Sequence, residues 1–198
     1  MIRQVDLRIE NQDWTKIRSI YDYIMQSERQ DKFEQNPDMV YGKQFNLGPY
    51  GTIIDTNKDI AGKGFILWQG PLFESALGWG KEARDFFKTL DLRNITWSIS
   101  YGNVMPHIDR INEITSGRTK INFIVSTKDP NGITISYDKQ GIVSYPSTPG
   151  LAWLLDTAVP HAVIANGMRE VLTFRFGNSF EEVSDFLDKC GPIIFKFG

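Results

Sequence analysis

The sequence predicts a mainly β chain of the α+β class, in which helices near the start support a β core. Helical hydrophobic spacing falls largely in the first 92 residues and in a short segment near the end. Between them, about 85 residues hold seven short runs rich in β-branched and aromatic residues, each bounded by Gly, Pro, Asn or Asp. Many short strands at this spacing are typical of a β-sandwich or a small barrel.

The first 33 residues predict a strand followed by a helix. Val5, Leu7 and Ile9 alternate with charged residues, which indicates a short strand. From residue 13 to about residue 33, apolar side chains recur at helical spacing, and Asp13 can cap the first turn. We therefore expect an amphipathic helix directly after the strand.

The next segment predicts connections rather than long elements. Residues 34–50 contain Asn-Pro and Gly-Pro pairs, which favour a loop with turns. Residues 52–55 and 64–68 are short strand candidates, and helical spacing returns from residue 72 to about residue 90. The Gly-, Asn- and aromatic-rich stretch 34–70 is our candidate for a lid and substrate loops, although an ordinary connector would have the same composition.

The seven predicted strands of the β core come after Leu92. They cover residues 94–101, 120–126, 132–137, 141–145, 152–155, 161–165 and 171–176.

A capped helix and a last strand follow the β core. Ser179 precedes a helical segment that runs to residue 188, and Glu182 completes a capping-box pattern. Gly191-Pro192 ends this helix, and residues 193–197 form a strand candidate. No linker or repeat interrupts the chain, so we expect one domain, 1–198. Its expected parts are helical support and substrate loops at 1–92, the β core at 93–178, and the helix and strand at 179–198.

Composition narrows the function classes. The chain has 198 residues, 41% hydrophobic and 23% charged, with a net charge of −2 and scattered basic residues. We therefore expect no nucleic-acid partner. A single cysteine, Cys190, excludes an internal disulfide framework, and charged residues near the start argue against a signal peptide. No apolar run approaches the length of a membrane span, so we expect a cytoplasmic protein without a membrane partner.

The only two histidines carry the strongest functional signal. His107 follows Pro106 and opens a His-x-Asp triplet with Asp109, and His161 follows Pro160 at the start of a predicted strand. Residues two apart on a strand share a face, so His107 and Asp109 can converge on one ion. A surface histidine bonded to an aspartate is the alternative for such a triplet alone. Two imidazoles, one carboxylate and open positions form the facial triad of non-haem Fe(II) oxygenases.

The second half resembles the iron(II)- and 2-oxoglutarate-dependent oxygenases, on the strings at residues 106–110, 120–126, 154–166 and 169–175. It is most similar to the aspartyl/asparaginyl β-hydroxylase-like branch and its small bacterial and phage members. The resemblance implies a double-stranded β-helix, that is, a jelly-roll or cupin-like core. It also implies that His107, Asp109 and His161 are catalytic iron ligands, that 2-oxoglutarate and O2 are cosubstrates, and that ascorbate serves as the reductant in vitro.

The cosubstrate contacts are less sharply indicated. An arginine can bind a carboxylate bidentately, and Arg169 and Arg175 both follow His161 on one face of a predicted strand. Arg169 matches the usual placement of the family better, and Arg175 is the alternative. Arg118, Asn122 and Ser98 are further candidates for cofactor binding. The alternative is that they have no binding role and are a solvated charge and polar groups at the edge of a strand.

The resemblance implies a dioxygenase, most often a hydroxylase, that releases succinate and CO2. An amino acid, a small metabolite or a peptide side chain remains open as the substrate. Two alternatives stay open as well: a cupin-like hydrolase or isomerase that uses Zn(II) or Mn(II), and a non-catalytic jelly-roll binding protein. The first alternative does not need an arginine that binds a dicarboxylate, and the second does not need the only two histidines to converge with an aspartate.

Overall fold

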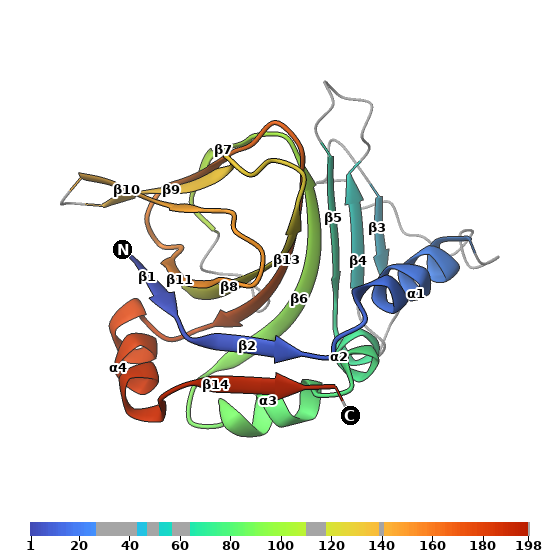
Figure 1. Cartoon of the computed structure of the whole chain (residues 1–198), viewed down its shortest axis with the longest axis horizontal. Coiled ribbons are helices and arrows are strands. Elements are labelled where there is room, and N and C mark those ends of the chain that lie inside the picture. Colours follow the sequence, from blue (N-terminus) through green and yellow to red (C-terminus); the bar gives the residue numbers. More distant parts are fainter. Residues whose placement is uncertain (27–42, 47–51, 57–63, 110–117, 139–140, 198) are drawn as a thin grey trace.

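The computed structural model describes residues 1–26, 43–46, 52–56, 64–109, 118–138 and 141–197. The described strands form three sheets of eight, four and two strands. Figure 1 shows the four-stranded sheet lying opposite the central strands of the eight-stranded sheet, and the helices lie on the other side of the latter.

Eight strands build the central core, and the chain passes back and forth between the two larger sheets as it forms them. They are β6 (Leu92–Tyr101), β7 (Val104–His107), β8 (Thr119–Thr127), β9 (Ile133–Asp138), β10 (Gly141–Pro146), β11 (Ala152–Asp156), β12 (His161–Ile164) and β13 (Met168–Phe176). The order is β11-β8-β13-β6 in one sheet and β10-β9-β12-β7 in the other, with antiparallel neighbours. This is a double-stranded β-helix, which confirms the expected jelly-roll, cupin-like core.

Four more strands extend the eight-stranded sheet on its two sides. They are β1 (Ile2–Val5), β3 (Lys43–Asn46), β4 (Thr52–Thr56) and β5 (Gly64–Gln69). The prediction of a loop over residues 34–50 is wrong for β3, because pairing with β4 supplies its ladder hydrogen bonds. The segments 34–42, 47–51 and 57–63, which make up most of the expected lid, lie outside the described residues.

Helices and one further strand pair surround this core. They are α1 (Trp14–Gln26), α2 (Pro71–Leu77), α3 (Gly80–Phe86), α4 (Phe180–Cys190) and the parallel pair β2 (Leu7–Glu10) and β14 (Ile193–Lys196). Asp13 caps α1, since its Oδ1 accepts from the amides of Thr15 and Lys16 at 2.9 and 3.1 Å. The expected extension of α1 to residue 33 lies outside the described residues. None of the described helices is long and apolar enough to cross a membrane.

The expected single helix over residues 72–90 is two helices. Gly78 ends α2 with a φ of 79°, a backbone conformation that other L-residues rarely adopt. A Cβ placed on Gly80 would lie 2.5 Å from the carbonyl oxygen of Glu74, so only glycine fits the close approach at the start of α3. Arg84 of α3 then binds Glu74 of α2, with Nε 2.5 Å from Oε2. Helical hydrophobic spacing continues through the break, which is why the sequence predicts one helix.

Strand β13 is buried on both faces, and the two faces have different characters. Leu172, Phe174 and Phe176 point into the apolar layer beneath the helices. Arg169 and Arg175, which alternate with them, line the space between the two sheets. Successive strand residues point to opposite faces, so one strand separates the hydrophobic core from a polar interior.

Aromatic side chains form the centre of the apolar layer. The Phe174 ring lies 6.2 Å from Trp79, 5.7 Å from Phe87 and 5.9 Å from Phe195, measured between centroids. Trp79 stacks on Phe195 with 3° between the ring planes. These contacts hold α3 and β14 against the outer face of the large sheet.

Glu170 is the exception on this outer face, because it is a fully buried carboxylate. Its oxygens accept from Arg18 Nε at 3.1 Å, Trp97 Nε1 at 2.7 Å and Ser126 Oγ at 2.8 Å. Burial of a charge is tolerated when it is paired and hydrogen-bonded in this way. Arg18 therefore attaches α1 to the sheet, away from the interior.

We expect Phe174→Ala to lower the free energy of unfolding by about 3–5 kcal/mol, because it leaves a cavity in the aromatic layer. The measurement is chemical denaturation followed by circular dichroism. Ile142→Ala is the matched control, since Ile142 is 69% exposed; we expect it to change the free energy of unfolding by about 0.5 kcal/mol or less. Equal effects of the two substitutions would contradict this view of the core.

Candidate metal centre

The two histidines meet because β7 and β12 are neighbours. His107 ends β7, His161 begins β12, and the antiparallel register places the two residues opposite each other. Their ring centroids are 4.3 Å apart. Pairing of strands far apart in the sequence therefore creates the imidazole pair that the sequence could only suggest.

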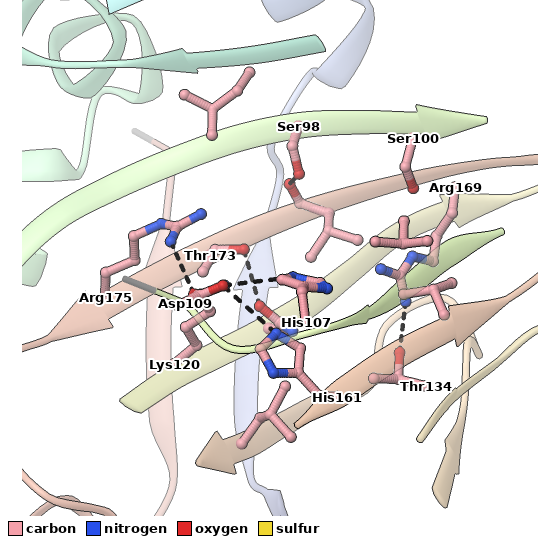
Figure 2. A pocket seen from close by; sticks show the side chains of 16 residues that line it. Ser98, Ser100, His107, Asp109, Lys120, Thr134, His161, Arg169, Thr173 and Arg175 are labelled. Carbon is pink, nitrogen blue, oxygen red and sulfur yellow. Dashed lines mark hydrogen bonds and ion pairs between the residues drawn. The ribbon is translucent and has the colours of Figure 1, made fainter. Parts of the chain in front are cut away.

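Asp109 completes a three-residue donor group. Its Oδ1 lies 3.5 Å from Nε2 of His107 and 3.6 Å from Nε2 of His161. One ligand atom from each of the three residues lies within 4.8 Å of the others. Figure 2 shows the three side chains converging from the two strands and the turn after β7.

The tautomer of each imidazole is set by the backbone. The Nδ1 of His107 lies 2.8 Å from the carbonyl oxygen of Met105, and the Nδ1 of His161 lies 3.1 Å from that of Val159. A carbonyl oxygen can only accept, so in the neutral form of each ring the proton lies on Nδ1 and the lone pair lies on Nε2. Fixing the outer nitrogen in this way orients an imidazole for metal binding through the other.

The two oxygens of Asp109 face different partners. Oδ1 faces the histidines, while Oδ2 forms an ion pair with Lys120 and lies 3.4 Å from Nη1 of Arg175. Burial raises the pKa of Asp109, but hydrogen bonds to both histidines and the charges of Lys120 and Arg175 outweigh it and hold that pKa well below its usual range. The group is therefore a carboxylate with one oxygen directed at the candidate metal position.

Two neighbouring groups also have shifted pKa values. The hydrogen bond to Asp109 raises the pKa of His107 above its ordinary 6.5, against an opposing effect of burial. Burial, helped by the nearby charge of Arg175, lowers the pKa of Lys120 to about 8, although Asp109 acts in the opposite direction. The carboxylate thus stabilises positive charge on both neighbours.

A cavity of about 220 Å³ opens beside the three donors, between the two sheets. Ser98 and Ser100 of β6, Asn122 of β8 and Thr173 of β13 line its floor. Asn122 is anchored on both sides of its amide, since it donates to Tyr145 Oη at 3.0 Å and accepts from Thr173 Oγ1 at 2.9 Å. The polar floor is therefore fixed by one hydrogen bond to a neighbouring strand, β13, and by another to β10 of the opposite sheet.

Arg169 lies at the end of this cavity away from Asp109. Its residue exposure is 8%, and Nη1 donates to Thr134 Oγ1 at 2.6 Å. Its Nε is buried and has no hydrogen-bond partner among the described residues. Burial lowers the pKa of Arg169, with an opposing contribution from Tyr145. A buried cation with an unused donor is suited to binding an anion.

Most of the residues suggested by the sequence come together here. The cavity lining includes the three candidate ligands, both candidate arginines, Asn122 and Ser98. Arg118 is the exception, because its side chain is exposed and does not line the cavity. Lys120, two residues further along, lines the cavity.

Sequence reasoning missed Lys120, Thr134 and Tyr145 as neighbours of the site. The available signal for Lys120 was its parity with Asn122, which places both side chains on one strand face. Thr134 and Tyr145 carry no such signal, because they lie beside Arg169 and Asn122 only after the sheets have formed.

The donor set fits a divalent metal ion. Two imidazole nitrogens and one carboxylate oxygen point to a common position, and no fourth His, Cys, Asp or Glu joins the group in the described part of the chain. Two His and one carboxylate with open positions is the arrangement typical of non-haem Fe(II) sites.

Sequence comparisons find no match, neither to a family model nor to a curated protein. Among solved structures, a 2OG-Fe(II) oxygenase family protein from Burkholderia pseudomallei is 12% identical, with a TM-score of 0.46 over 59% of this chain and 67% of that one. A prolyl-4-hydroxylase from Pseudomonas putida is 13% identical, with a TM-score of 0.43 over 88% and 91%. Hazelnut (Corylus avellana) vicilin is 18% identical, with a TM-score of 0.37 over 57% and 29%.

The chain thus spans less than a third of the vicilin chain that it resembles. The similar structures range from oxygenases to a vicilin, and their sequence identities to this chain are low. The activity therefore has to be argued from the site itself.

We expect His107→Ala and His161→Ala each to abolish stoichiometric binding of Fe(II), because two donors cannot hold the ion as three do. The measurement is metal analysis after anaerobic reconstitution and desalting, with circular dichroism to check the fold. Neither substitution touches the aromatic layer, so unfolding is not expected. A wild-type iron content in either variant would contradict the assignment of these residues as metal ligands.

Proposed function

We propose that this protein is a non-haem Fe(II)- and 2-oxoglutarate-dependent dioxygenase. It would hydroxylate an amino acid, a small metabolite or a peptide side chain and release succinate and CO2. The observation that carries the proposal is a His107–Asp109–His161 donor group that opens on a cavity with a buried arginine, Arg169, at its other end.

His107, Asp109 and His161 would hold Fe(II), which fits a set of two imidazoles and one carboxylate with open positions. When bound, iron and 2-oxoglutarate supply the activation of O2, coupled to loss of CO2 from the 2-oxo acid. The contribution of the chain is geometry: the carbonyls of Met105 and Val159 bind the two Nδ1 atoms, which leaves Nε2 as the atom of each ring that would bind the metal ion.

Arg169 would bind the distal carboxylate of 2-oxoglutarate. Its guanidinium is held by Thr134 and retains a buried, unused donor, so a carboxylate would supply the missing acceptor. The apolar side chains of Val163 and Val171 line the same cavity, and Val163 is paired with Thr134. In such surroundings a charge-assisted contact is stronger than it would be in water.

The narrower relationship to the aspartyl/asparaginyl β-hydroxylase-like branch depends on the sequence motifs alone, and we keep it as part of the proposal. The two alternatives are a cupin-like Zn(II) or Mn(II) hydrolase or isomerase and a non-catalytic jelly-roll binding protein. The hydrolase or isomerase gives no role to a buried arginine opposite the donor group, and the binding protein does not need the two histidines to converge with Asp109, so both features favour the dioxygenase.

The proposal is tested by turnover of the cosubstrate. Protein purified anaerobically and supplied with Fe(II), ascorbate, O2 and 2-oxoglutarate should release succinate slowly. A panel of amino acids, metabolites and peptides should then contain members that accelerate this release. Tight binding of Zn(II), no spectral change on anaerobic addition of Fe(II) and 2-oxoglutarate, and no thermal shift with 2-oxoglutarate would together support one of the alternatives.

Arg169→Gln should weaken 2-oxoglutarate binding by about 10- to 150-fold, since a charge-assisted hydrogen bond is worth about 1.5–3 kcal/mol. The measurement is calorimetric titration of the metal-loaded protein with 2-oxoglutarate under anaerobic conditions. Iron content should stay at the wild-type level, because Arg169 contacts none of the three donors. If Arg175→Gln has this effect and Arg169→Gln does not, the assignment of the two arginines must be reversed.

A further inference from the structure

More cationic side chains line the cavity than the distal carboxylate of the proposed cosubstrate would neutralise. Three cationic side chains line it, those of Lys120, Arg169 and Arg175, whereas Asp109 is the sole carboxylate among the described lining residues. Burial of a cation is unfavourable unless an anion or hydrogen-bond acceptor accompanies it. Arg169 is accounted for by the distal carboxylate of 2-oxoglutarate, which leaves Lys120 and Arg175.

Lys120 and Arg175 compete for the same atom. The ammonium of Lys120 pairs with Oδ2 of Asp109, and Nη1 of Arg175 lies 3.4 Å from that oxygen. A carboxylate carries one negative charge, and the other oxygen of Asp109 faces the histidines. One anionic group therefore serves two cations and a candidate metal ion, so positive charge is left over.

Arg175 has unused hydrogen-bonding capacity. Its Nε is buried and finds no partner in the described part of the chain, and its contact with Asp109 is long for a charge-assisted hydrogen bond. The side chains of Arg175 and Lys120 are 17% and 11% exposed, and both line the cavity. A small anion in the cavity can therefore reach them without any change of the backbone.

Arg175 and Arg169 do not serve the same position. They are six residues apart on one face of β13, which separates their Cα atoms by roughly 20 Å. Figure 2 shows their guanidinium groups on opposite sides of the histidines and Asp109. The proposed metal position lies between them, so one arginine faces the distal carboxylate of the cosubstrate and the other faces a second ligand.

We propose that Arg175, with Lys120 beside it, forms an anion subsite for the substrate, and that the substrate carries a carboxylate. This inference rests on the proposed function and names the substrate class of that same site. The carboxylate can belong to a free carboxylic acid or to an acidic side chain of a peptide. In either case, the subsite would fix the anionic end of the substrate beside the metal position.

The test uses protein loaded with Mn(II) and saturated with N-oxalylglycine, a 2-oxoglutarate mimic that cannot turn over. N-acetylglycine and its amide probe a free acid, while N-acetylaspartate amide and N-acetylasparagine amide probe a side chain. We expect at least one acid to bind at least tenfold more tightly than its uncharged partner, by calorimetry. Which pair shows the difference tells the two sources apart.

Arg175→Gln should remove this preference for the acid and leave Mn(II) content and N-oxalylglycine affinity within about threefold of wild type. Arg8→Gln is the matched control, because it removes the same charge from a side chain that is 62% exposed. It should keep the preference. If Arg175→Gln does not fold, Arg175→Lys keeps the charge but loses the planar fork, and it should bind the acid with intermediate affinity.

Three results would overturn the inference. The first is equal binding of acid and uncharged partner to wild-type protein. The second is a preference for the acid that survives in Arg175→Gln, which would indicate direct binding to the metal ion. The third is loss of N-oxalylglycine binding in Arg175→Gln, which would make Arg175 a cosubstrate contact. Failure of wild-type protein to bind Mn(II) or N-oxalylglycine would instead count against the proposed function itself.

Discussion

The alternation of side chains along β13 is the constraint on which the rest of the structure depends. Leu172, Phe174 and Phe176 anchor the strand in the aromatic layer beneath the helices, and this fixes which residues face the other sheet. Because a shift by one residue would reverse both faces, the apolar layer also holds Arg169 and Arg175 in the cavity. The register of β13 that stabilises the apolar layer therefore also positions the two arginines of the site.

Electrostatic balance around Asp109 is the second determinant of the site. One oxygen faces two imidazoles, and the other faces Lys120 and Arg175. A single carboxylate in a largely buried position can neutralise only part of this positive charge. The remaining positive charge is the basis for the two anions that we propose for the cavity, a dicarboxylate cosubstrate and a substrate with a carboxylate of its own.

Much of the β core follows from local sequence signals, and the departures have physical causes. Seven strands could be predicted because each is rich in β-branched or aromatic residues and closed by a turn residue. The helix over residues 72–90 was predicted as one, because hydrophobic spacing does not register the left-handed backbone of Gly78. Strand β3, within the predicted loop of residues 34–50, exists because it pairs with the next strand, β4, whereas its own four residues, Lys-Gln-Phe-Asn, show no clear strand pattern.

For the site, the sequence by itself determined the donor types: two histidines, one nearby aspartate and two arginines on one strand face. The tertiary structure decided how they meet, through the pairing of His107 with His161 and the direction of each oxygen of Asp109. It also placed Lys120 of β8 in the cavity lining, whereas Arg118, a candidate from the sequence, is exposed and lies outside that lining. The physical reason is that side-chain parity within a strand is local, whereas strand pairing and burial depend on residues far away in the chain.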